Sequence, residues 1–198
     1  MKKNYHVTNS GIEKKLVFID RKDVDRFTKL LQYYQFKNPP TRFSFRKRQA
    51  ASEEKPLLPL VTILCYIQMP DHFHLLLEEA EDGNVSKFLS LVTNSYTKYF
   101  NARYKRSGPL FKGIFKREII ATTDHLIKTS VLIHGEPVTK GIVENVKKFP
   151  FSSFPEYLGE KEGFCSKETI LSHFSSEQDY YESVVNTLEQ KQIANFLH

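Results

Sequence analysis

Cysteine is scarce in this sequence, with two residues, Cys65 and Cys165, in 198 positions. Two thiols cannot build a disulfide framework or a four-thiolate zinc site, and we expect a reduced, cytosolic setting. No apolar run approaches the roughly 18 residues of a transmembrane helix, and no apolar stretch follows the N-terminal lysines as it would in a secretory signal. Internal repeats and zinc-finger spacings are also missing. Because the sequence has no apolar run long enough for a transmembrane helix, we expect no membrane partner.

The composition that remains is typical of a folded protein rather than a disordered one. Hydrophobic residues make up 40% of the chain and aromatic residues 13%, enough to bury a core. The 29 basic and 23 acidic side chains leave a net charge of +6. Such an excess is compatible with a nucleic acid or another anionic surface but does not by itself identify either.

Hydrophobic periodicity divides the chain into strands and helices. Apolar and β-branched runs predict strands at 5–8, 61–69, 72–78 and 115–122, with a turn at Pro70-Asp71 joining the middle pair into a hairpin. Helical spacing predicts a helix at 21–35 capped by Asp20 and another at 85–104. Strands and helices mix without strict alternation, which favours an α+β fold with helices packed on a sheet.

Prolines and glycines mark the remaining boundaries. Residues 37–59 contain four prolines and a basic patch from Arg42 to Arg48, which predicts an irregular loop. A short helix is expected after a cap at Thr123, ended by Gly135 and Pro137. Beyond Pro150 the chain looks helical and peripheral, with a long helix at about 177–197.

His72 and His74 are two residues apart on a predicted strand. Residues i and i+2 of a strand project from the same face, so the two imidazoles should lie together, ~6–7 Å apart at the backbone. They could hold one metal ion with open coordination positions, which a phosphate oxygen could fill. The alternative is a chance pair on a half-exposed strand.

The surrounding segment Met69–Leu77, which reads Met-Pro-Asp-His-Phe-His-Leu-Leu-Leu, resembles the signature of the tyrosine transposases of single-stranded DNA, including the REP-associated tyrosine transposases. Further matches occur in the same order as in that family, over roughly residues 4–159, at 5–11, 95–101, 106–113, 132–137, 141–143 and 149–159. The pieces are individually weak, and their order makes the resemblance specific.

The resemblance implies a ferredoxin-like α+β domain over 1–159, followed by a helical extension over 160–198. It implies a protein, usually a homodimer, that binds hairpins of single-stranded DNA. In this family a tyrosine attacks the scissile phosphate, and a divalent metal, Mg²⁺ or Mn²⁺, is held by two histidines and a third polar side chain. By resemblance, His72, His74 and Glu136 are the metal ligands here.

The position of the nucleophile departs from the family pattern. Leu132 stands where the tyrosine is expected, and a leucine has no oxygen with which to form a phosphoester. Ser10 and Ile114 stand where arginine is common, which should weaken phosphate contacts, whereas Glu136 replaces an asparagine with another oxygen ligand. His134 could act as an acid or base near this position, or satisfy a helix end.

A basic segment from Lys98 to Arg117 contains seven cations and no acidic residue, interleaved with five aromatic residues. Cations neutralise phosphates, and exposed rings stack on unpaired bases. The alternative is a solvated face whose aromatics are buried. The DNA-binding candidates in this segment are Arg103, Lys105, Arg106, Lys112, Lys116 and Arg117.

Three functions remain open from the sequence. The first is a transposase-like DNA-binding protein whose tyrosine chemistry is impaired. The second is an active metal-dependent nuclease or transposase that uses a displaced tyrosine or a metal-activated water. The third is a scaffold for protein interactions, with affinity for neither metal nor DNA.

Overall fold

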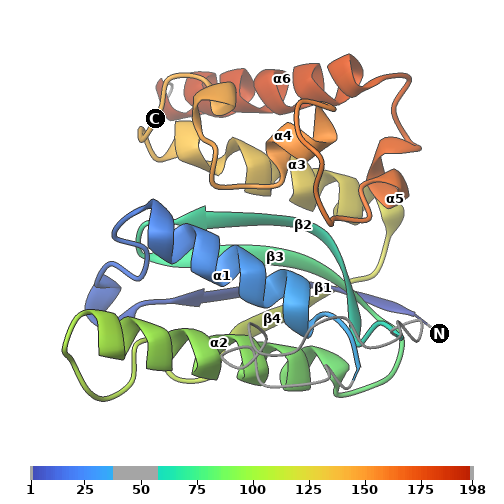
Figure 1. Ribbon diagram of the computed structural model, residues 1–198. Helices are drawn as coiled ribbons and strands as arrows, with labels where there is room; N and C mark the ends of the chain where they lie inside the picture. The colour runs from blue at the N-terminus through green and yellow to red at the C-terminus, as the bar shows by residue number, and fades with distance from the viewer. Residues whose placement is uncertain (1, 38–57, 197–198) are drawn as a thin grey trace.

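A computed structural model describes residues 2–37 and 58–196 of the chain. Four strands form an antiparallel sheet in the order β2-β3-β1-β4, with helices on both faces (Figure 1). The strands are β1 (Lys3–Ser10), β2 (Val61–Met69), β3 (His72–Glu79) and β4 (Lys116–Ile120). The sheet confirms the α+β class, and the chain order β1-α1-β2-β3-α2-β4 is that of a ferredoxin-like domain.

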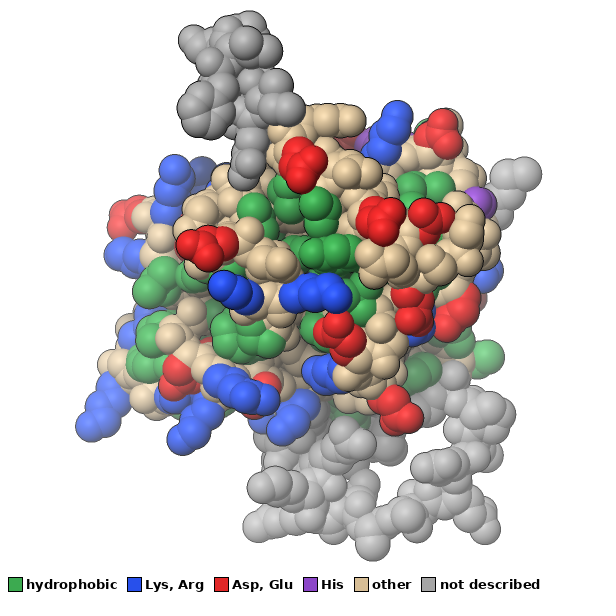
Figure 2. Space-filling view, turned by 90° about the horizontal axis from the view of Figure 1, so that it is seen from above, with side chains coloured by type: hydrophobic (Ala, Val, Ile, Leu, Met, Phe, Trp, Pro, Cys, Tyr) green, Lys and Arg blue, Asp and Glu red, His purple; other side chains and the backbone are tan. Residues whose placement is uncertain are grey.

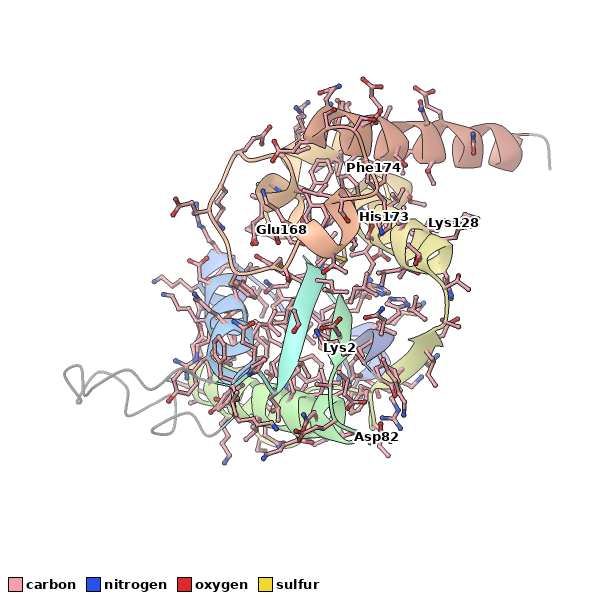
Figure 3. The ribbon with its side chains drawn as sticks, turned by 90° about the vertical axis from the view of Figure 1, so that its right-hand side faces the viewer. Lys2, Asp82, Lys128, Glu168, His173 and Phe174 are labelled. Atoms are coloured by element: carbon pink, nitrogen blue, oxygen red, sulfur yellow. The ribbon has the colours of Figure 1, made fainter. Side chains whose placement is uncertain are left out.

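The helices form two layers, which appear on opposite sides of the sheet when the molecule is turned (Figure 3). One layer holds α1 (Arg21–Tyr34) and α2 (Asn84–Arg103). The other holds α3 (Thr123–Thr139), α4 (Phe154–Tyr157), α5 (Glu168–Leu171) and α6 (Glu177–Phe196). None of these described helices combines the length and the apolar character that crossing a bilayer requires.

The predicted elements of the first half of the chain are confirmed with small shifts at their ends. The hairpin of β2 and β3 turns at Pro70-Asp71, as expected. Asp20 caps α1, because its side chain accepts hydrogen bonds from the backbone N–H groups of Lys22 and Asp23. The basic loop patch from Arg42 to Arg48 lies outside the described residues.

Two predictions about α3 are wrong. The helix is capped by Thr122, one residue earlier than expected, and it continues through Gly135 and Pro137 to Thr139. Gly135 lies against α6, where a Cβ would meet Leu188 Cδ2 at 3.1 Å. The close approach of the two helices therefore explains a glycine inside α3, and packing overrides the weak helix propensity of this residue.

The sheet separates two hydrophobic clusters. The first lies between the sheet and the layer of α1 and α2, and it includes Phe27 and Tyr96. The second lies under α3, and it includes Ile170 of α5 and Tyr180 and Val184 of α6, all three fully buried. Helices α5 and α6 thus contribute to the second core and are not peripheral, although this part of the chain is helical as expected.

Candidate metal centre

His72 and His74 project from β3 toward α3, as the two-residue spacing predicts. Between them Phe73 points the opposite way and is fully buried in the first hydrophobic cluster. The two imidazole rings lie edge to face, with centroids 5.1 Å apart. The alternation of a strand therefore brings both rings to one side of the sheet.

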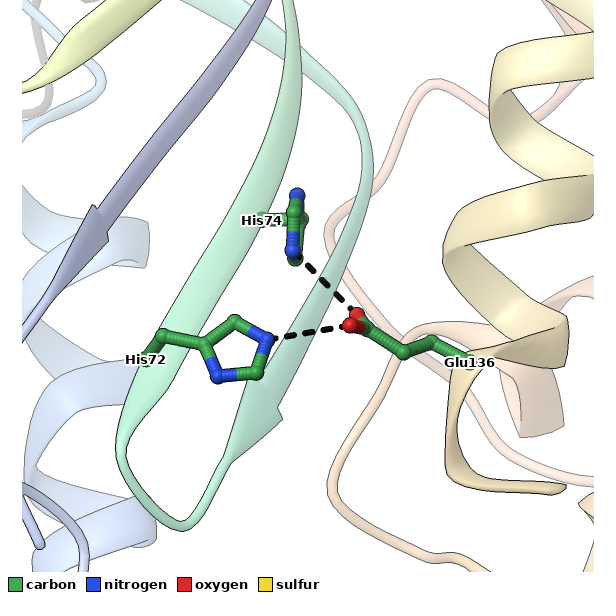
Figure 4. Close-up of side chains that lie close together, drawn as sticks. All are labelled: His72, His74 and Glu136. Atoms are coloured by element: carbon green, nitrogen blue, oxygen red, sulfur yellow. Dashed lines mark hydrogen bonds and ion pairs between the residues drawn. The ribbon is translucent and has the colours of Figure 1, made fainter. Parts of the chain in front are cut away.

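Glu136 reaches the two histidines from α3 (Figure 4). Its Oε1 lies 3.1 Å from Nε2 of His72, and its Oε2 lies 3.2 Å from Nε2 of His74. Two nitrogens and one carboxylate oxygen, one from each residue, lie within 4.8 Å of one another. The three side chains are between 16% and 19% exposed, so the cluster is sheltered but open to solvent at one side.

The other nitrogen of each ring also has a partner. Nδ1 of His72 donates to Oδ1 of Asp71 at 2.6 Å, and Nδ1 of His74 lies 2.8 Å from Nε2 of His6. Histidines that bind metals almost always have the second nitrogen engaged in this way. His6 was missed by sequence reasoning, because the pairing of β1 with β3 cannot be read from local spacing.

The electrostatics of the cluster favour the ligand forms of His74 and Glu136 but the protonated form of His72. Burial lowers the pKa of His74 to about 4, so this imidazole is neutral near pH 7. Burial lowers the pKa of His72 too, but hydrogen bonds to Glu136 and Asp71 outweigh it and raise the value overall. Burial raises the pKa of Glu136, yet the hydrogen bond from His72 and the nearby histidines lower it overall, which keeps the carboxylate charged.

The residues fit a divalent cation by their donor set and by their outer partners. Imidazole nitrogens and a carboxylate oxygen suit first-row divalent ions, and three protein ligands leave coordination positions open for solvent or substrate. The three residues assigned by resemblance are thus brought together by the fold.

Leu132 lies on α3 one turn before Glu136, and its side chain is 42% exposed. Residues four apart on a helix share a face, so Leu132 and Glu136 lie on the same side of α3. The exposure of Leu132 shows that its side chain faces away from the hydrophobic core. An apolar side chain is therefore presented to solvent beside the candidate metal centre.

His134 lies in the second core rather than at the metal centre. It is fully buried, with Nδ1 at 2.7 Å from Tyr180 Oη and Nε2 at 2.8 Å from Ser153 Oγ. Burial lowers its pKa to about 3. Both ring nitrogens are engaged away from solvent, so the geometry gives His134 a structural role in the second core, neither at the end of its helix nor as an acid or base.

Of the six DNA-binding candidates, two arginines make contacts within the protein and four cations are exposed. Arg103 is paired with Asp20 and, at 2.6 Å, with the buried carboxylate of Asp23. Arg106 donates to the carbonyl oxygen of Pro109 and lies over the ring of Phe100. The other four are exposed: Lys105, Lys112, Lys116 and Arg117.

The aromatic residues of the same segment pack inward. Phe100 and Phe111 are buried in the first hydrophobic cluster, and Tyr99, Tyr104 and Phe115 pack against it. Tyr104 Oη also donates to Asp23 Oδ2 at 2.8 Å. The segment therefore offers exposed cations without a platform of exposed rings, which matches the alternative of buried aromatics.

The two positions where arginine is common in the resembling family lie in different surroundings. Ser10 pairs with His72 in the register of β1 and β3 and thus lies at the edge of the metal centre. Ile114 is 89% exposed in the segment before β4.

Comparison with known proteins supports the fold. No protein-family model and no curated protein matches the chain. Among solved structures, a REP-associated tyrosine transposase bound to a REP hairpin shares 16% identity, with 82% of this chain and 85% of that chain covered and a TM-score of 0.57. A protein assigned as a transposase from Deinococcus radiodurans R1 shares 13% identity over 65% of this chain and 87% of that chain, with a TM-score of 0.40, too low to support an argument. The first likeness confirms the resemblance at the level of the fold.

Proposed function

Since this chain has the fold of a REP-associated tyrosine transposase, we propose that it binds hairpins of single-stranded DNA at the His72–His74–Glu136 cluster and forms no covalent link through tyrosine. The observation that carries this proposal is the cluster itself, with Leu132 one turn away on the same helix. The two histidines of the family's metal site have counterparts in His72 and His74, Glu136 offers an oxygen ligand in place of the usual asparagine, and Leu132 stands in place of the nucleophile.

The metal is the first element of the proposal. His72, His74 and Glu136 would hold a divalent ion, which when bound polarises a phosphate oxygen of the DNA. Mg²⁺ prefers oxygen ligands, whereas imidazole suits later first-row ions. Two nitrogens and one oxygen therefore favour Mn²⁺ over Mg²⁺.

Exposed cations beside the metal centre support binding of a phosphate backbone. Lys116 of β4 pairs with Thr8 of β1, which pairs with His74 of β3. Paired residues of antiparallel strands share a face, so Lys116 lies in the same row as His74, two strand spacings or roughly 10 Å away. If one phosphate of the DNA lies near the metal, the next phosphate along the DNA strand comes within reach of Lys116.

A second candidate function is metal-dependent cleavage by water. The open coordination positions of a three-ligand site favour it, because a bound water can serve as a nucleophile. A displaced tyrosine has less support, because six of the described tyrosines are buried. Of the partly exposed ones, Tyr33, Tyr99 and Tyr104 pack against the first hydrophobic cluster, on the other side of the sheet from the metal centre, and Tyr181 packs against the second. The homodimer that the resemblance implies stays a prediction, which the mass of the protein in solution would test.

A hairpin oligonucleotide with Mn²⁺ separates these possibilities. We expect a gel shift that weakens steeply with salt, because neutralised phosphates release counterions, and no protein–DNA adduct on a denaturing gel. Cut strands that disappear in His72→Ala would favour the water mechanism. Absence of both DNA and Mn²⁺ binding would support the interaction scaffold and overturn the proposal.

Leu132→Tyr is the informative companion variant. It restores a phenol on the exposed side of α3, one turn from Glu136. We expect it to gain a Mn²⁺-dependent covalent adduct with the hairpin, and Leu132→Phe is the matched control because it adds the same ring without the oxygen. An adduct formed by the Phe variant would show that another residue is the nucleophile.

A further inference from the structure

His6 of β1 lies against the metal centre without belonging to it. Its Nε2 is 2.8 Å from Nδ1 of His74, and the two rings have centroids 5.0 Å apart and planes within 17° of each other. Thr8 is the direct partner of His74 in the β1–β3 register, so His6 reaches His74 diagonally across the sheet. The central strand thus fixes the position of His6.

The contact constrains the protons of both rings. A hydrogen bond between two neutral imidazoles needs one N–H donor and one bare nitrogen. If His74 donates from Nδ1, its Nε2 is bare and faces Oε2 of Glu136 at 3.2 Å. If His6 donates instead, Nε2 of His74 carries the proton and donates it to Glu136. The first arrangement alone leaves His74 ready to bind a cation.

We propose that His6 is a positioning residue: its Nε2 accepts a hydrogen bond from Nδ1–H of His74 and thereby holds the Nε2 lone pair of His74 toward the cation site. The inference rests on the proposed metal site. In this role His6 orients His74 as Asp71 orients His72, whose Nδ1 donates to the carboxylate of Asp71. The two ligand rings of β3 are then oriented by different partners, one local and one from the neighbouring strand.

His6 has a further neighbour that fits this role. Glu118 of β4 is the direct cross-strand partner of His6 and lies on the same face of the sheet. When Nε2 of His6 accepts a hydrogen bond, the ring proton of His6 resides on Nδ1. A carboxylate beside the ring favours that state, since it attracts the polar N–H group.

Two substitutions distinguish the hydrogen bond from simple packing. His6→Phe keeps a ring against His74 but cannot accept its hydrogen bond. His6→Gln places an amide oxygen near the position of Nε2 and can accept it. His173→Phe is the matched control, because His173 is exposed just after α5 and is not part of the metal centre (Figure 3).

The measurement is Mn²⁺ affinity by electron paramagnetic resonance on the full chain. We expect His6→Phe to weaken the affinity 10–100-fold, the usual cost of losing an outer partner, and His6→Gln and His173→Phe to stay within about threefold of the wild type. Long-range ¹H–¹⁵N spectra of the Zn²⁺-loaded wild type should show the His74 proton on Nδ1. Far-ultraviolet circular dichroism verifies that each variant is folded.

Several results would overturn the assignment. If His6→Phe binds Mn²⁺ as tightly as the wild type, or if Gln and Phe weaken it equally, the hydrogen bond does not position His74. A His74 proton on Nε2 in the Zn²⁺-loaded protein would also show that the hydrogen bond does not position His74. A wild type that binds neither ion would instead refute the metal site of the proposed function, so the two failures are distinguishable.

Discussion

Glu136 joins the candidate metal centre from α3, whereas both histidines come from β3. Glu136→Gln keeps the shape and one oxygen of the side chain and removes its charge. We expect the affinity for Mn²⁺ to fall at least tenfold, or about 1.4 kcal/mol, because ligand charge is a main determinant of affinity for hard cations. Isothermal titration calorimetry would measure the loss.

Glu144→Gln provides the control for this variant, because it removes the same charge from a side chain that is 94% exposed and paired with Lys148. Its affinity for Mn²⁺ should match that of the wild type. Equal effects of the two substitutions would mean that net charge, and not ligation by Glu136, governs binding.

Among the individual residues of the candidate metal centre, some could be predicted from the sequence. The two histidines follow from strand alternation, since period two needs no knowledge of the fold. Glu136 came from a family resemblance, because its approach to β3 depends on how α3 packs. His6 was missed, since a single histidine in a short apolar strand carries no signal until β1 is placed beside β3.

The helices and strands, like the site residues, were predicted only in part from the sequence. Spacing predicted α1, α2 and the β2–β3 hairpin, because each has a clear hydrophobic period over many residues. It failed at the end of α3, where the local signals of Gly135 and Pro137 compete with tertiary packing. The reason for the glycine lies in α6, some 50 residues later in the chain, where no local pattern can reveal it.

The contact between α3 and α6 at Gly135 can be tested directly. Gly135→Ala should be close to neutral, because about 1 kcal/mol of helix propensity offsets the tight contact of its Cβ with Leu188 at 3.1 Å. Gly135→Leu should lower the free energy of unfolding by about 1–3 kcal/mol through overpacking. Urea unfolding measures both, and Lys128→Leu on the exposed side of α3 is the control (Figure 3).

The basic segment at the end of α2 and in β4 yields a prediction about which cations meet DNA. Lys116→Ala should weaken hairpin binding and reduce the slope of log affinity against log salt by about one, because Lys116 is exposed. Arg103→Ala should lower the thermal midpoint instead, since it removes a charged partner of the buried Asp23. Gel shifts at several salt concentrations and thermal melts separate the effects.

One result for Lys116→Ala and Arg103→Ala would contradict this prediction. If Arg103→Ala changes the salt slope as much as Lys116→Ala while its melting is unaltered, the ion pair with Asp20 and Asp23 opens when DNA binds. The sequence could not make this distinction, because the acidic partners lie some 80 residues before Arg103 in the chain.

For the molecule as a whole, the face over the second hydrophobic cluster carries charges of both signs. Seen from above, over the helical layer that contains α6, acidic and basic side chains are interspersed (Figure 2). This face presents no continuous basic surface in the view of Figure 2, and the DNA contacts proposed above lie at β4 instead. Beneath it, His134 connects α3 to Tyr180 of α6 and to Ser153 before α4.

His134 should make the stability of the whole protein depend on pH. Its pKa is lowered by burial to about 3, against roughly 6.5 in the unfolded chain. Between these values the unfolded state binds the extra proton, so the contribution is fully present above pH 6.5 and declines as the pH falls toward 3. From pH 7 to pH 5 the loss due to this residue should be about 2 kcal/mol.

Urea unfolding of the wild type and of His134→Gln at pH 7 and pH 5 isolates this contribution. The variant should be less stable at pH 7, because it loses two buried hydrogen bonds, but the difference between the proteins should shrink by about 2 kcal/mol at pH 5. His6, His72 and His74 titrate in both proteins, so their effects cancel in the comparison. A difference that stays constant with pH would mean that His134 is as readily protonated in the folded protein as in the unfolded chain.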